Sequence, residues 1–117
     1  MTLPTNLDHL ATADELNALV SEKENVMVCC GRMGPMCVPV YGAMEDLRDS
    51  GDYDNVEFRD MLFDSPEAQV IRDLPECSSF RGLPFTVYFR NGSVAAATSS
   101  IQSADQIKAQ LDEHFAG

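Results

Sequence analysis

The 117-residue sequence contains no tryptophan, no pair of cysteines separated by two residues, and no long apolar run. None of its apolar stretches approaches the roughly 20 residues that span a bilayer, so we expect no membrane span. The N-terminal part also lacks the basic start, apolar core and small-residue cleavage site of an export signal. A cytoplasmic location is therefore expected.

Basic residues are scarce, with 8 Lys and Arg against 19 Asp and Glu, which gives a formal net charge of -11. Such a charge repels phosphate backbones and acidic membrane surfaces, so neither nucleic acid nor a membrane is an expected partner. The excess of acid serves solubility or steers the protein toward a basic partner, and composition alone favours solubility. Acidic residues near strand ends, such as Asp60 and Asp64, are interpreted as part of this acidic surface.

Sequence motifs for cofactors and metals are missing as well. There is no phosphate loop, no dinucleotide glycine fingerprint and no metalloprotease or hydrolase motif. The two histidines, His9 and His114, lie near the chain ends, away from most of the cysteines. We expect no cofactor and no metal site. Met33 and Met36 with Cys37 have the soft atoms that copper(I) prefers, but packing within a loop is the simpler interpretation.

A chain of this length with 44% hydrophobic residues is expected to form one domain, residues 1–117, with a loose N-terminus over residues 1–6. Apolar periodicity and capping residues predict strands and helices in the order β-α-β-α-β-α-β-β-α. The expected strands cover residues 7–10, 26–30, 56–63, 85–89 and the stretch after residue 92. The expected helices begin near residue 12, at 38 with an end at 49, at 65 with an end at 74, and near residue 103.

The stretch from Gly82 to Val94 combines a strand-opening proline, a strand and a turn. Every residue from Phe85 to Phe89 is β-branched or aromatic, and Asn91-Gly92 favours a two-residue hairpin turn. Proline lacks the N–H that a ladder requires, so Pro84 fits only at the start of its strand.

A Gly-Leu-Pro sequence, an apolar strand, an Asn-Gly turn, a second strand and a closing amphipathic helix together resemble the C-terminal half of a thioredoxin. The resemblance extends from about Leu7 to Phe115. It implies an α/β thioredoxin-like fold, with a mixed sheet of four to five strands flanked by about four helices. It also implies that Pro84 is cis and faces a redox loop.

The loop after the apolar strand 26–30 departs from the family pattern Trp-Cys-Gly-Pro-Cys, because it reads Arg32-Met33-Gly34-Pro35-Met36-Cys37. Matching its Gly-Pro to that of the family leaves methionines at both cysteine positions. Matching the following helix instead places Cys37 at the second, resolving cysteine and Gly34 at the nucleophile, with one deletion. We prefer the second register because buried helix positions resist shifts more than loop positions do. Ordinary Cys-x-x-Cys exchange is unavailable under either.

Four cysteines remain to be placed: Cys29, Cys30, Cys37 and Cys77. Cys37 is the strongest candidate for a reactive thiol, because a helix N-terminus favours the thiolate and Arg32 would add to this. The resemblance places Cys29 where the family has a buried aspartate, beneath Cys37, with Cys30 on the opposite face of the sheet. A Cys29–Cys37 bond closes a nine-residue loop and adds roughly 2–3 kcal/mol if unstrained. Cys77 is interpreted as a peripheral surface thiol.

Two classes of function follow from the resemblance. The first is an atypical thiol-redox protein acting on protein thiols or disulfides, with Cys37 as the reactive thiol and Cys29 or Cys30 as its partner. The second is a redox-inactive module that binds a protein partner in the same groove. In both, the substrate or partner would contact the loop and the strand-opening proline: Met33, Gly34, Pro35, Met36, Leu83 and Pro84. The sequence leaves the partner and the oligomeric state open.

Overall fold

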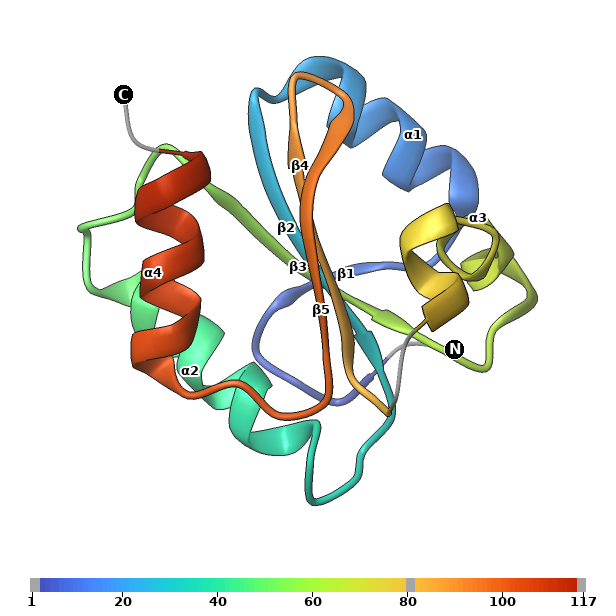
Figure 1. The fold of residues 1–117 in the computed structure, drawn as a ribbon, viewed down its shortest axis with the longest axis horizontal. Coiled ribbons are helices and arrows are strands. Elements are labelled where there is room, and N and C mark those ends of the chain that lie inside the picture. The colour runs from blue at the N-terminus through green and yellow to red at the C-terminus, as the bar shows by residue number, and fades with distance from the viewer. Residues whose placement is uncertain (1–2, 80–81, 116–117) are drawn as a thin grey trace.

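The computed structural model describes residues 3–79 and 82–115, which form a five-stranded sheet covered by helices on both faces (Figure 1). The strands are β1 (Asp8–Leu10), β2 (Asn25–Gly31), β3 (Glu57–Leu62), β4 (Phe85–Arg90) and β5 (Ser93–Ser99). The helices are α1 (Ala13–Glu22), α2 (Val38–Asp49), α3 (Gln69–Arg72) and α4 (Ala104–His114). The predicted order of elements is confirmed.

The sheet is mixed, with strand order β1-β3-β2-β4-β5. β1 and β2 both run parallel to β3, whereas β4 is antiparallel to β2 and to β5. All seven residues of β2 are buried. This explains why the apolar run of β2 shows no alternation, since a strand covered on both faces has no side turned toward water.

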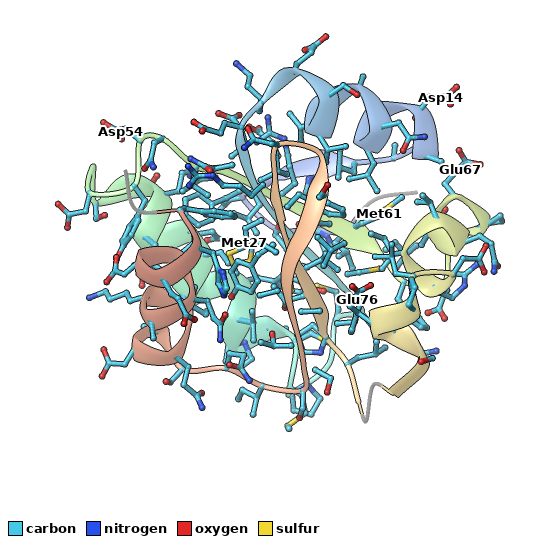
Figure 2. The ribbon with its side chains drawn as sticks, turned by 45° about the horizontal axis from the view of Figure 1, so that its top comes forward. Asp14, Met27, Asp54, Met61, Glu67 and Glu76 are labelled. Atoms are coloured by element: carbon cyan, nitrogen blue, oxygen red, sulfur yellow. The ribbon has the colours of Figure 1, made fainter. Side chains whose placement is uncertain are left out.

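Two apolar cores lie on opposite faces of the sheet. α2 and α4 cover one face, and α1 and α3 cover the other (Figure 1). Met27 of β2 belongs to the first core and Met61 of β3 to the second, and the two side chains point to opposite sides of the sheet in Figure 2. Acidic side chains such as Asp54 lie at the periphery of the molecule in the same view.

Local signals in the sequence set several element boundaries. Thr12 caps α1 in a reciprocal capping box with Glu15, and Ser103 caps α4 in the same way with Gln106. The hairpin between β4 and β5 turns at Asn91-Gly92, whose φ angles are 53° and 83°. Positive φ at both positions is the geometry that matches the twist of a two-residue hairpin.

The segment after β3 differs from the predicted single helix over 65–74. Ser65 does cap the segment, but it begins with a 3₁₀ turn, Pro66–Ala68, and α3 is only four residues long. A second 3₁₀ helix, Pro75–Ser79, then starts at the proline that was expected to end the segment. Pro75 has no backbone donor to continue the hydrogen bonds of α3, so the chain starts a new turn there.

The N-terminal segment is less loose than predicted. Leu3 is 2% exposed and packs in the core under α2, and the Thr5 hydroxyl donates a hydrogen bond to Asp60. Residues 1 and 2 lie outside the described residues. Among the residues that the structure describes, no helix is long and apolar enough to cross a membrane.

Candidate functional site

Cys37 lies where the loop from β2 turns into α2. It is the N-cap residue of α2, with Pro39 in the first turn as the sequence predicted. The backbone N–H groups of Cys37 and Val38 both donate to the carbonyl of Gly34, at 3.1 and 3.0 Å. The Cys37 side chain makes no capping hydrogen bond to the first turn of α2. Its sulfur instead accepts a bond from the Arg32 backbone N–H at 3.5 Å.

Gly31, the last residue of β2, lies at the centre of this site. A Cβ atom placed on it would lie 2.7 Å from the Tyr41 hydroxyl, 3.0 Å from the Cys37 sulfur and 3.1 Å from the Pro84 Cβ. The Tyr41 hydroxyl donates to the Arg32 carbonyl at 2.9 Å, which holds the phenol in place. The loop, α2 and the start of β4 therefore converge on one backbone position that only glycine fits.

A groove of about 510 Å³ opens between the loop and the segment before β4. Its lining is mostly apolar and consists of Arg32, Gly34, Pro35, Met36, Cys37, Phe63, Gly82 and Leu83. Of the predicted contact residues, Met33 and Pro84 are not among these, although Pro84 lies beside Gly31. The sequence prediction that Met33 and Met36 pack inside the loop is wrong, because their exposed fractions are 47% and 42%.

The Leu83–Pro84 peptide bond, at the edge of the groove, is cis. The carbonyls of Gly82 and Pro84 each accept a hydrogen bond from the Ser100 backbone N–H, both at 3.0 Å. Leu83 lies between these two residues, and its backbone N–H and carbonyl have no hydrogen-bond partner among the described residues. Within the described part of the chain, Leu83 thus has one free backbone donor and one free backbone acceptor, in a groove that Cys37 also lines.

The rim of the groove carries a bidentate ion pair. The Arg32 guanidinium donates to both carboxylate oxygens of Asp64, at 2.7 and 2.8 Å. It also lies 5.9 Å from the centre of the Phe63 ring, which Arg72 approaches to 5.6 Å. The hydrogen bonds from Arg32 lower the pKa of the exposed Asp64 carboxyl. Arg32 therefore binds Asp64 with its side chain, and reaches Cys37 with its backbone N–H.

The two strand cysteines point to opposite faces of the sheet. Cys29 belongs to the core that contains Cys37 and Tyr41, whereas Cys30 belongs to the core on the α1 and α3 side with Cys77. Burial raises the pKa of both strand thiols, that of Cys30 to about 12. The Thr86 hydroxyl acts against burial and lowers the pKa of Cys29. The structure thus brings Cys29, and not Cys30, to the side of Cys37.

Cys77 was expected to be a surface thiol, and this expectation is wrong. It is 5% exposed, because the 3₁₀ helix Pro75–Ser79 packs its sulfur against the core under β2. Burial raises its pKa too. All four cysteines are free thiols.

The prediction that Asp60 belongs to the acidic surface is also wrong. Asp60 is 0% exposed and lies in β3 on the face under α2. The Thr5 hydroxyl donates a hydrogen bond to one oxygen of its carboxylate, and His9 Nδ1 is hydrogen-bonded to the other at 2.7 Å. Burial raises the pKa of Asp60, and these two partners partly offset the increase. A usable signal was present, since Asp60 lies two residues beyond the apolar Phe58 and so shares its face.

No group of three or more metal-binding side chains occurs among residues 3–79 and 82–115. In the register preferred above, Gly34 occupies the position of the first, nucleophilic cysteine of the pattern, so the loop supplies no thiol there.

No family model matches the chain, and no curated protein matches it. Solved structures do match over nearly its whole length. The thioredoxin of Malassezia sympodialis superimposes with a TM-score of 0.77 at 16% identity, covering 99% of this chain and 96% of the other. Mitochondrial thioredoxin 3 of Saccharomyces cerevisiae gives 0.73 at 16% identity, covering 92% and 94%. The oxidised thioredoxin of Plasmodium falciparum gives 0.72 at 18% identity, covering 96% and 100%. The chain has the thioredoxin fold.

Proposed function

We propose that the protein is an atypical thiol-redox protein in which Cys37 exchanges disulfides with a protein substrate. The observation that carries the proposal is the position of Cys37, whose side chain lines the groove while Cys29 lies in the same core beside it. The thioredoxin fold is consistent with such chemistry. One fold can serve many functions, so the basis of the proposal is the core that Cys29 and Cys37 share, and not the fold.

The reaction balances with two thiols of this chain. The Cys37 thiolate attacks one sulfur of a substrate disulfide, which forms a mixed disulfide and releases the other substrate sulfur as a thiolate. Cys29 then loses its proton and attacks the Cys37 sulfur. This step forms the Cys29–Cys37 bond and releases the second substrate thiolate. The substrate is reduced by two electrons, the protein is oxidised by two, and an external dithiol resets the protein.

The groove would hold the substrate as an extended peptide. The unpaired backbone groups of Leu83 provide one donor and one acceptor for such a peptide, in the manner of an added strand. Pro84 closes the edge beside Gly31, and the loop residues Gly34, Pro35 and Met36 form the opposite wall, with Met33 exposed in the same loop as a further contact for the peptide. A reducing compartment such as the cytoplasm would keep the thiols ready for attack.

Trapping of the mixed disulfide tests this proposal. In the Cys29→Ser variant the second step is blocked, so we expect a substrate protein with an accessible disulfide to accumulate on Cys37. The Cys77→Ser variant is the matched control, and it should turn over like the wild type because Cys77 lies on the other face of the sheet. The proposal fails if Cys37 forms no mixed disulfide in the native state and all thiols react only after unfolding.

A redox-inactive binding module is the second candidate. It is favoured by the exposed Met36 beside the groove and by the small exposed fraction of Cys37, 3%. Methionine supplies adaptable apolar contacts at protein-binding surfaces. If this candidate is correct, Cys37→Ser binds a reduced and alkylated substrate protein as the wild type does, whereas Met36→Glu loses the binding. Titration calorimetry distinguishes these outcomes.

A further inference from the structure

A row of polar side chains crosses the sheet beneath Cys37. Strand register places His9 of β1 beside Asp60 of β3, Asp60 beside Cys29 of β2, and Cys29 beside Thr86 of β4. Neighbouring strands lie about 4.8 Å apart, and residues in register share a face, so each member is the immediate neighbour of the next. Cys29 is therefore flanked by a carboxylate on one side and by a hydroxyl on the other.

Asp60 is the only carboxylate that is fully buried among the residues the structure describes. Its oxygens are held by Thr5 and by His9, and the His9 side chain is 28% exposed. The carboxylate therefore contacts a group that can exchange protons and that reaches water. Its other titratable or charged neighbours are Glu45 and Tyr41 of α2 and Cys29 of β2.

Thr86 supplies an independent observation. Its hydroxyl is buried, with an exposed fraction of 1% for the residue, and apart from the Cys29 sulfur, on whose pKa it acts, it has no hydrogen-bond partner among the described residues. A buried hydroxyl without a partner is costly in a folded protein. The hydroxyl would gain a strong acceptor if Cys29 became a thiolate, because a hydrogen bond to an ionised group is about twice as strong as a neutral one.

We propose that Asp60 accepts the proton of Cys29 when Cys29 attacks the Cys37 disulfide, and that His9 connects Asp60 to solvent. The Cys29 S–H bond breaks and the proton moves to the Asp60 carboxylate, directly or through one water. The thiolate, held by the Thr86 hydroxyl, forms the bond to the Cys37 sulfur and expels the substrate thiolate. The imidazole of His9 exchanges its ring proton through water to the Nε2–H form, Nδ1 then takes the proton from Asp60, and Nε2 releases a proton to solvent. This inference rests on the proposed function, since it concerns its second step.

The two steps can be followed separately with an aromatic disulfide whose thiolate leaving group is coloured. Attack by Cys37 releases the first equivalent, and attack by Cys29 on the resulting mixed disulfide releases the second. In Asp60→Asn the first phase should be unchanged, because Cys37 carries it out. The second phase should slow by about 100-fold near neutral pH, the usual contribution of a proton acceptor, and recover as pH rises and hydroxide replaces the carboxylate.

Control variants separate proton transfer from anchoring. Asp54→Asn makes the same chemical change on the exposed surface, and both phases should match the wild type. His9→Asn keeps a donor to Asp60 but cannot carry a proton, so its second phase should slow by about tenfold. This variant decides the matter even if Asp60→Asn fails to fold.

The outcomes also distinguish the inference from the proposed function. If Cys37 gives no first phase in the wild type, the proposed function fails. If both phases occur and the second keeps the wild-type rate and pH profile in Asp60→Asn, Asp60 only anchors the N-terminal segment, and if it does so in His9→Asn, the proton does not leave through His9. The inference is then overturned while the proposed function stands.

Discussion

At the scale of single residues, Gly31 determines how closely the parts of the site approach one another. Its missing side chain leaves room for the Tyr41 hydroxyl, the Cys37 sulfur and Pro84. Two of the three are held in place, because the Tyr41 hydroxyl is hydrogen-bonded to the Arg32 carbonyl and Pro84 directly precedes the buried start of β4. The loop and the start of β4 can thus lie this close together because Gly31 has no Cβ atom.

The Gly31→Ala substitution should therefore destabilise the protein by about 1–3 kcal/mol, the usual cost of an added group in a packed site. Urea unfolding measures this change. Gly42 in α2 is the matched control, because a Cβ there meets nothing within 4 Å. Gly42→Ala should stabilise by roughly 0.5–1 kcal/mol, since alanine is the better helix former. Equal effects at the two positions would contradict this account of Gly31.

At the scale of elements, caps and turns decide where helices and strands begin. The Ser103 hydroxyl accepts the Gln106 N–H at 3.1 Å, and the Gln106 side chain accepts the Ser103 N–H at 2.8 Å. α4 then packs Ile107 and Leu111 into the core that holds Cys29 and Cys37. The capping box thus supports one of the two helices that enclose the reactive face of the sheet.

Removal of this cap by Ser103→Ala should lower the free energy of unfolding by about 1 kcal/mol. Ser93 is a suitable control, because it is exposed and its side chain makes no hydrogen bond among the described residues. Ser93→Ala should change the stability by less than about 0.5 kcal/mol. Chemical denaturation of both variants gives the comparison, and an equal loss in both would show that the cap contributes nothing.

The elements with local signals were predictable from the sequence. The capping boxes at Thr12 and Ser103 and the Asn91-Gly92 turn depend on residues three or fewer positions apart. The segment from Pro66 to Ser79 was not, because competition between 3₁₀ and α geometry depends on what the short helices pack against. The order of strands and helices could be predicted from apolar periodicity, and this order indicates the fold.

At the scale of the whole molecule, long-range packing placed the residues that the sequence did not reveal. Asp60 is buried because the N-terminal segment folds back and brings Thr5 and His9 to it from more than fifty residues away. Cys77 is buried for a similar reason, since a later 3₁₀ helix covers the face of Cys30. The spacing from Phe58 indicates which face of the strand Asp60 occupies. The contacts that bury it depend on which strands become neighbours, and no local pattern encodes that.

Burial of Asp60 should make the stability of the molecule depend on pH. Its pKa is raised in the native state, so the native protein holds this proton at pH values where the unfolded chain has lost it. The contribution is fully present below the unfolded pKa and is lost as pH rises through the native pKa. Each unit of the difference corresponds to about 1.4 kcal/mol.

Relative to Asp60→Asn, the wild type should therefore lose stability as pH rises above the ordinary pKa of an aspartate and through the raised pKa of Asp60, while Asp54→Asn follows the wild type. Urea unfolding across this range measures the difference. Arg48 and Arg32 lower the pKa values of Asp49 and Asp64, and these two groups change the stability with pH in the opposite direction. Their contribution is the same in both proteins, so it cancels when the stability of Asp60→Asn is subtracted from that of the wild type. A difference that stays constant with pH would show that the native state does not perturb Asp60.

The central claim, that Cys37 and Cys29 form a working pair, is tested most directly by a tryptic disulfide map after the native protein reacts with a substrate disulfide. Trypsin cuts after Lys23, Arg32 and Arg48, so the two cysteines fall on separate peptides. The account predicts a reducible link between peptides 24–32 and 33–48, which persists in Cys30→Ala and disappears in Cys29→Ser. An unmodified Cys37, or four thiols that react only after unfolding, would contradict it.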